Sequence, residues 1–176
     1  MTNDEDLMLR AAGGDMDAFE ELVERHHRAA LNTAYRFLSD QSLAEDVAQE
    51  AFLRILAGAS RYRPLAAFRT YLFNVVWHLC IDAYRKSRAV RMPSDAAPAD
   101  ERDGPVGEAV RGELRRSVRA AVERLPERQR MAVVLKHFEG LSYGEIAQVL
   151  ECSTRAVDSL LIRAKRHLKE ELGGLL

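Results

Sequence analysis

The sequence lacks long apolar runs, is poor in cysteine, and shows no sign of a secretory leader. Its two cysteines among 176 residues, Cys80 and Cys152, lie far apart and have no CxxC or Cys/His ligand spacing. Neither a disulfide framework nor a zinc site is indicated. The amino terminus, MTNDEDLMLR, is acidic where a leader would be basic and then apolar. We therefore expect a cytoplasmic protein without membrane insertion.

Enzyme motifs are missing as well. There is no HExxH pair, no glycine-rich phosphate loop and no nucleophile elbow. The histidine pair in ERHHR, residues 24–28, would place its two rings on different faces of a helix. We predict no catalytic residue, no metal and no cofactor, and an enzyme is the weakest of three functional alternatives.

Proline is scarce and unevenly distributed. Three of the five prolines and two glycines fall in AVRMPSDAAPADERDGPVG, residues 89–107, which has no helical apolar period. This composition predicts a flexible linker. On both sides apolar residues recur at helical spacing and no convincing alternating strand is present. The prediction is an all-α protein with two small helical domains, residues 1–88 and 108–176.

The first domain is expected to contain three helices. The first has an apolar face from Phe19 to Phe37 and a capping box at Asp17 and Glu20. The second begins at a capping box of Ser42 and Glu45 and stops near Gly58, with the apolar face Leu43, Val47, Phe52, Leu53 and Leu56. Pro64 opens the third, which runs to about Ser87.

The second domain ends in a predicted helix-turn-helix. After helices over 110–125 and from Pro126 to Gly140, a capping box of Ser142 and Glu145 starts a short helix, Tyr143 to Leu150. A three-residue turn leads to a long helix from about Thr154 to Leu172. Such a pair places its second helix in the major groove of DNA. The expected packing positions are Ile146, Ala147 and Leu150 on the first helix, and Val157, Leu160 and Leu161 on the second.

Positive charge is concentrated in this second domain. Residues 108–176 carry 13 Lys and Arg against 10 Asp and Glu, although the whole chain has a net charge of -1. The start of the last helix should present groups that suit base edges and phosphates, namely Ser153, Thr154, Arg155, Asp158 and Ser159. Further along, Arg163, Lys165 and Arg166 would neutralise phosphates. The alternative is a solvated basic face.

The third helix of the first domain carries a line of aromatic residues. Phe73, Trp77 and Tyr84 are expected to lie away from the core face, with Arg85, Lys86 and Arg88 just beyond. Aromatic rings stack on unpaired bases and basic groups follow the backbone, so the pattern favours single-strand binding. The alternative is a second packed face, which we favour for Phe73 alone.

Together these motifs resemble the extracytoplasmic-function group of sigma factors, from about Asp15 to Leu172. SLAEDVAQEAFLRIL, residues 42–56, is similar to the family's polymerase-binding helix, and LPERQRMAVVLKHFEGLSYGEIAQVLECSTRAV is similar to its minus-35-reading domain. The resemblance implies that residues 1–88 are a region 2-like domain that binds core polymerase and melts the minus-10 element. It implies that residues 108–176 are a region 4-like domain.

The resemblance also implies residue roles, and this chain departs from the family at three notable positions, of which His78 and Asp158 are implied DNA contacts and Glu151 is a turn position. His78 replaces a common asparagine, Glu151 a common turn glycine, and Asp158 a common basic residue. The implied core-polymerase contacts are Asp46, Gln49, Glu50, Phe52 and Leu53; for Phe52 and Leu53 a core position is an equal alternative. The implied minus-10 contacts are Trp77, His78, Asp82, Arg85, Lys86 and Arg88. The implied minus-35 contacts are Ser153, Thr154, Arg155, Asp158, Ser159, Arg163, Lys165 and Arg166.

The implied partners are core RNA polymerase, promoter DNA and an inhibitory anti-sigma factor. The competing hypothesis is a stand-alone transcriptional regulator that uses its helix-turn-helix as a dimer. It predicts tight duplex binding by the protein alone, whereas a sigma factor binds promoters appreciably only with core enzyme.

Overall fold

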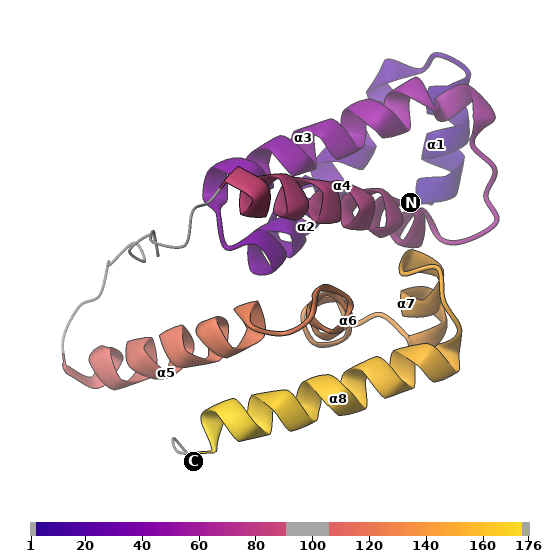
Figure 1. Ribbon diagram of the computed structural model, residues 1–176. Helices are drawn as coiled ribbons and strands as arrows, with labels where there is room; N and C mark the ends of the chain where they lie inside the picture. Colours follow the sequence, from indigo (N-terminus) through magenta and orange to yellow (C-terminus); the bar gives the residue numbers. More distant parts are fainter. Residues whose placement is uncertain (1–2, 91–105, 174–176) are drawn as a thin grey trace.

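The computed structural model describes residues 3–90 and 106–173, and for residues 106–111 the backbone only. Within these ranges the chain is helical, without strands, which confirms the all-α class (Figure 1). The elements are α1 (Asp4–Ala12), α2 (Met16–Leu38), α3 (Gln41–Ala57), the short 3-10 helix η1 (Ala59–Arg61), α4 (Phe68–Val90), α5 (Val106–Glu123), α6 (Glu127–His137), α7 (Tyr143–Val149) and α8 (Thr154–Leu172).

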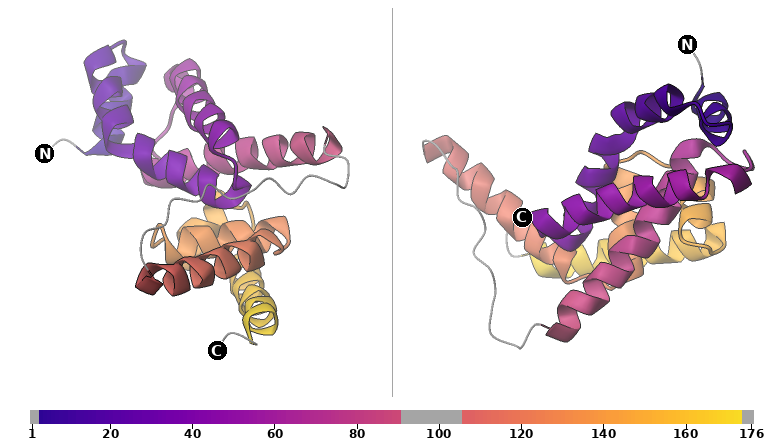
Figure 2. Two further views of the ribbon diagram at one scale, coloured as in Figure 1. Left: turned by 90° about the vertical axis from the view of Figure 1, so that its left-hand side faces the viewer. Right: turned by 90° about the horizontal axis from the view of Figure 1, so that it is seen from above.

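The helices form two halves that pack on each other. Helices α1 to α4 make one half and α5 to α8 the other, and Figure 1 and the left view of Figure 2 show the halves side by side. Helix α4 lies on α7, and α2 lies on α6. Helix α4 extends to Val90 and α5 starts at Val106, so helix occupies both ends of the predicted linker. The rest of that segment, residues 91–105, lies outside the described residues.

Two predicted helix starts are wrong by two residues. Helix α2 is capped by Asp15, whose side chain accepts from the Ala18 N-H, and α3 by Asp40, which accepts from the Leu43 N-H. An N-cap is the last residue with extended backbone, and in each case the aspartate upstream of the predicted cap holds that position. The predicted boxes at Asp17 and Ser42 therefore do not form.

Helix α4 begins at Phe68 and not at Pro64. The Phe68 N-H donates to the Glu5 carboxylate of α1 at 2.7 Å, so a residue distant in the sequence satisfies one free donor of the first turn. Helix α1 was not predicted, and neither was this contact.

The aromatic line of α4 faces inward: for Phe73 this is the packed face favoured from the sequence, whereas for Trp77 and Tyr84 it is contrary to the prediction. Phe73 is 1% exposed and Trp77 5%, and the Trp77 ring meets the Phe37 ring edge-on at 5.8 Å. Tyr84 is half-buried and also meets Phe37. The prediction failed because α4 is covered on two sides, by α2 and α3 and by α7 of the other half.

The helix-turn-helix agrees with the prediction, α7 ending at Val149, one residue before the predicted Leu150. The Ser142 hydroxyl accepts from the Glu145 N-H, and the Glu145 carboxylate accepts from the Ser142 N-H at 2.8 Å, so the capping box forms. Ile146, Ala147 and Val157 are buried. In the turn, Glu151 has φ 52°. This left-handed conformation costs a residue with a Cβ roughly 1 kcal/mol.

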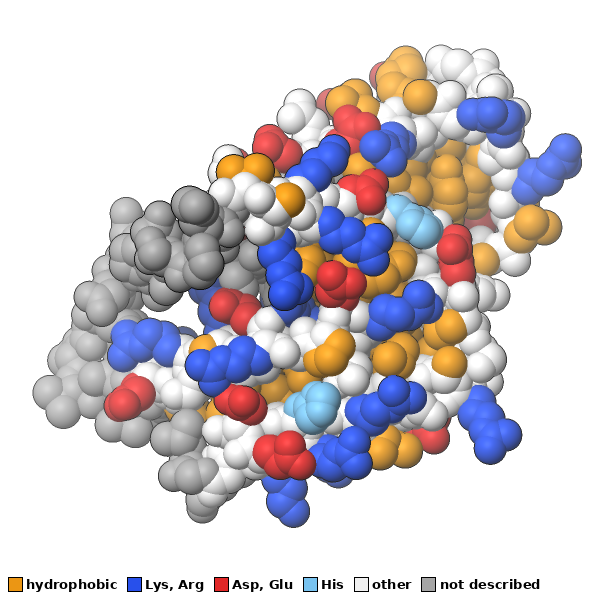
Figure 3. Space-filling view, viewed as in Figure 1, with side chains coloured by type: hydrophobic (Ala, Val, Ile, Leu, Met, Phe, Trp, Pro, Cys, Tyr) orange, Lys and Arg blue, Asp and Glu red, His pale blue; other side chains and the backbone are white. Residues whose placement is uncertain are grey.

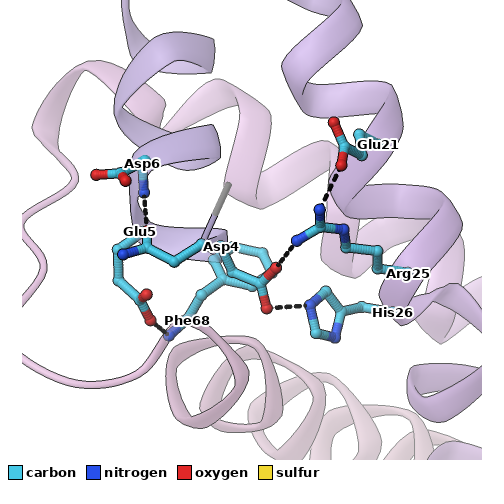
Figure 4. Close-up of polar contacts among 8 residues, drawn as sticks. Asp4, Glu5, Asp6, Glu21, Arg25, His26 and Phe68 are labelled. Carbon is cyan, nitrogen blue, oxygen red and sulfur yellow. Dashed lines mark hydrogen bonds and ion pairs between the residues drawn. The ribbon is translucent and has the colours of Figure 1, made fainter. Parts of the chain in front are cut away.

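Asp4 fastens α1 to α2, as Figure 4 shows. Its carboxylate accepts from the Arg25 guanidinium at 2.8 Å and lies 2.6 Å from His26 Nε2. Burial raises the pKa of Asp4, but the hydrogen bonds from Arg25 and His26 outweigh it and the net pKa is lowered. The ionised form is therefore the one that stabilises the docked helix.

Asp4→Asn should reduce the free energy of unfolding by about 1.5 kcal/mol at neutral pH, the lower end for hydrogen bonds to a charged group, because the carboxylate is partly exposed. Because the folded-state pKa of Asp4 lies below its unfolded value, its contribution is present above about pH 4 and disappears as the pH falls through the folded-state pKa. Urea unfolding from pH 7 to pH 3 measures the difference. Asp6→Asn, an exposed acid of the same helical turn, is the control; equal effects at all pH values would contradict the assignment.

Candidate nucleic-acid interface

The amino-terminal part of α8 presents an exposed polar row. Thr154, Arg155 and Asp158 are exposed and Ser159 is half-buried, while Val157 is packed inside. Ser153 caps the helix by accepting from the Ala156 N-H at 3.1 Å. Arg163, Lys165 and Arg166 are exposed further along. The structure thus brings the predicted minus-35 set onto one accessible helix. In Figure 3, Lys and Arg side chains lie along the lower part of the molecule, where α8 is, and are also spread over the rest of this face.

A basic hollow adjoins this row and includes a residue that sequence reasoning missed. Arg128 of α6 lines it together with Arg155 and Arg163 of α8. The Arg128 guanidinium also donates to the Leu150 carbonyl at the end of α7, which positions the group over the turn. Three guanidinium groups around one depression suit DNA phosphates. Arg128 could be recognised as part of this group only from the packing of α6 on α8.

The predicted minus-10 residues of α4 lie partly against the second half. His78 Nε2 is 3.2 Å from Oε1 of Glu151, and the Arg85 guanidinium is 3.6 Å from the Glu127 carboxylate. Trp77 is buried. Asp82, Lys86 and Arg88 are exposed. The six residues therefore do not form one continuous open surface in this arrangement.

A hollow of about 630 Å³ lies between the loop before α4 and the helix-turn-helix. Its walls include Tyr62, Tyr71 and Asn74 from the first half and Gln148 and Glu151 from the second. Burial raises the pKa of Tyr62 to about 12, so its hydroxyl stays protonated, and in the described residues it has no hydrogen-bond partner. Aromatic walls beside Arg61 and Arg63 suit an unstacked base. The sequence indicated none of these loop residues.

Glu139 joins the two halves. Its side chain is 7% exposed and accepts from the Thr33 hydroxyl at 3.0 Å and from the Arg69 guanidinium at 2.8 Å. Arg69 also donates to the Glu139 carbonyl, and Arg36 lies 3.8 Å from the carboxylate. All three partners belong to α2 and α4, so a buried charge of the second half is satisfied by the first.

Arg130 makes the reciprocal contact. This residue of α6 is 3% exposed and donates to the Phe37 carbonyl at the end of α2 at 2.9 Å. Its guanidinium also lies over the rings of Phe37 and Tyr84, within about 5 Å of each. A cation from the second half therefore satisfies a free carbonyl at the carboxyl end of α2.

Helix α3 carries an exposed stripe on the side away from the core. Asp46, Gln49 and Leu53 are exposed and follow one another at three or four residues, which places them on one face. Leu53 is 55% exposed. Phe52 is buried against Phe19 and His27, and Glu50 pairs with Arg54. Of the two residues with alternative interpretations, Phe52 is core and Leu53 is surface. Val47 of the predicted apolar face is also buried, and Leu56 is half-buried against the core.

Metal-binding and membrane-spanning features are not found among the described residues. Within them, no three His, Cys, Asp or Glu side chains are arranged to hold a metal ion. No described helix is long and apolar enough to cross a membrane. Cys80 is buried, Cys152 is half-buried, and both are free thiols.

Comparisons with known proteins match both halves. The family model "Sigma-70 region 2" matches residues 22–90 and "Sigma-70, region 4" matches residues 115–168. The RNA polymerase sigma-H factor of Pseudomonas aeruginosa is 31% identical over 98% of this chain and 95% of its own length. The ECF RNA polymerase sigma-E factor of Escherichia coli is 30% identical over 98% of this chain and 96% of its own.

Solved structures share the arrangement. CnrH, in complex with the cytosolic domain of CnrY, has a TM-score of 0.76 and 29% identity, with 97% of each chain covered. RpoE from Bartonella quintana, in complex with the anti-sigma factor NepR, has a TM-score of 0.69 and 20% identity, covering 88% of this chain and 96% of its own. The whole-length identity and the two region matches show that the chain belongs to the extracytoplasmic-function group of the sigma-70 family of RNA polymerase sigma factors.

Proposed function

We propose that the protein directs core RNA polymerase to promoters by dividing three tasks among its helices. The exposed stripe of α3 binds the polymerase, the row on α8 reads the minus-35 element, and α4 captures the minus-10 strand. The observation that carries the proposal is the presence of both sigma regions, in order, on one chain. The polymerase supplies the catalysis, and the protein supplies position and specificity.

The roles on α8 follow from its chemistry. Arg155 has the forked donors that read guanine, and it is exposed near the helix start where base edges are within reach. Lys165 and Arg166 lie two turns or more further along and contact phosphates. Asp158 accepts from cytosine amino groups.

In this proposal, α4 can bind the minus-10 strand only where the second half does not cover it. His78, Asp82, Arg85, Lys86 and Arg88 line the strand, and the hollow beside Tyr62 and Tyr71 receives an unstacked base. Trp77 stacks on DNA only after leaving its packing against Phe37.

An anti-sigma factor is the proposed inhibitory partner, on the strength of family membership; the Bartonella quintana protein forms a complex with a partner of this kind. We place the protein in the cytoplasm, where core polymerase and promoter DNA are found. The stand-alone regulator is not favoured, because the first half matches a sigma region of its own.

Run-off transcription tests the function. Purified core polymerase on a pool of random promoter fragments should give defined start sites only when this protein is added, and aligning the upstream sequences should reveal two elements. Retention of duplex DNA by the protein alone, without any start site, would instead support the regulator hypothesis.

Asp46→Ala should weaken binding to core polymerase by roughly tenfold, a cost of about 1.4 kcal/mol that is ordinary for a central interface residue. Its carboxylate is exposed, so the melting temperature should stay unchanged. The matched control is Glu24→Ala, which removes the same charge from an exposed position of the neighbouring helix α2. Titration of labelled protein with core enzyme measures the affinity of both variants. Equal losses of affinity would show that the exposed stripe of α3 is not part of the polymerase interface.

Arg155→Ala and Lys165→Ala should differ in kind. Loss of a base-reading fork costs about 1–3 kcal/mol and relaxes preference at one promoter position. Loss of a phosphate contact weakens initiation evenly across promoter variants and lowers the salt dependence. Initiation from a set of single-base promoter variants separates the two patterns; the same pattern for both residues would refute the division of roles.

A further inference from the structure

Acidic side chains of the second half cover the DNA face of α4. Asn74, His78 and Arg85 of α4 recur at four and seven residues, so they share one side of the helix. Glu151 and Glu127 of the second half meet this side. Oε1 of Glu151 lies 3.4 Å from Asn74 Nδ2 and 3.2 Å from His78 Nε2, and the Glu127 carboxylate lies 3.6 Å from the Arg85 guanidinium.

The carboxylates of Glu127 and Glu151 meet α4 in the way that the anionic oxygens of a DNA phosphate would. The His78 and Asn74 hydrogen bonds lower the pKa of Glu151, so the group is a carboxylate at neutral pH. A single anionic oxygen therefore sits between two donors on successive turns of α4, and a second anion meets a guanidinium two turns further on. Donors arranged like this bind the oxygens of a nucleic-acid backbone equally well.

The same acid also borders the hollow beside the loop before α4. Gln148 and Glu151 form its wall on the second-half side, facing Tyr62 and Tyr71. A strand that used both α4 and this hollow would have to displace the helix-turn-helix turn. By contrast, Arg155 and Lys165 of α8 remain exposed. Packing of the two halves thus obstructs α4 and leaves α8 open.

Glu151 holds its position against a conformational preference. Its φ of 52° suits glycine better than a residue with a Cβ. Its carboxylate is the part of the residue that contacts α4. This contact explains why an acidic residue occupies a position where glycine would be free of strain.

We propose that Glu127 and Glu151, the acidic pair, stand in for DNA phosphates on α4, so that the second half competes internally with single-stranded DNA. The inference rests on the proposed function, because it takes α4 as the strand-binding helix. The contacting side chains are 30–66% exposed, so each contact is weak and reversible. The obstruction is therefore removable when polymerase separates the halves.

The test compares single-strand and duplex binding by the full chain without polymerase. Fluorescence anisotropy with a mixed-sequence single strand of about 16 nucleotides should show that Glu127→Gln/Glu151→Gln binds roughly three- to tenfold more tightly than the unmodified protein. Affinity for a mixed-sequence duplex of the same length should stay within a factor of about two, because α8 is already open.

Two controls separate the proposal from simpler effects. Glu113→Gln/Glu170→Gln removes the same charge from exposed positions of the second half and should leave single-strand affinity nearly unchanged. Glu151→Gly relieves the left-handed strain while removing the carboxylate, so it should raise single-strand affinity without loss of folding.

Equal gains for the control pair, or for single strand and duplex alike, would show a general charge effect and overturn the proposal. Unchanged single-strand affinity in both Glu151 variants would also overturn it. If the unmodified protein directs defined start sites with core polymerase in that case, the proposed function stands and only the inference fails. Absence of start sites would count against the proposed function itself.

Discussion

The carboxylate of Glu139 is buried between the two helical halves, and its need for partners determines how they sit on each other. A buried ionised group is tolerated only when hydrogen bonds and opposite charge surround it. Here Thr33 and Arg69 supply them from the first half. In the opposite direction, the buried guanidinium of Arg130 donates to the Phe37 carbonyl of the first half, and also to the Glu123 and Leu125 carbonyls of its own half. Each half thus satisfies a charge that belongs to the other.

This mutual arrangement sets the exposure of the functional helices. With Arg69 held at the start of α4, the rest of that helix lies along α7, and its polar side meets Glu151 and Glu127. The first turns of α8 point the other way and stay accessible. With the roles proposed for α8 and α4, the duplex-reading surface is open and the strand-binding surface is obstructed. This proposal gives a physical order to promoter recognition, in which the upstream element is available first.

Helix capping shows how far local sequence patterns predict structure. The Ser142–Glu145 box formed as predicted, because both of its partners lie within one turn. The boxes predicted at Asp17 and Ser42 did not form, because Asp15 and Asp40 held the extended backbone position upstream. At α4 the first-turn donor is satisfied by Glu5 from a different helix, and no local pattern predicts such a partner.

The sequence by itself determined the helical class, the helix-turn-helix with its exposed basic row, and family membership, since these depend on spacing within one or two turns and on motifs of contiguous residues. Only the tertiary structure decided that Trp77 is buried, that Leu53 is exposed while Phe52 is not, and that Arg128 joins Arg155 in one hollow. An amphipathic period identifies one buried face of a helix. It does not reveal that a helix such as α4 is covered on two sides, because the second cover comes from residues far away in the chain.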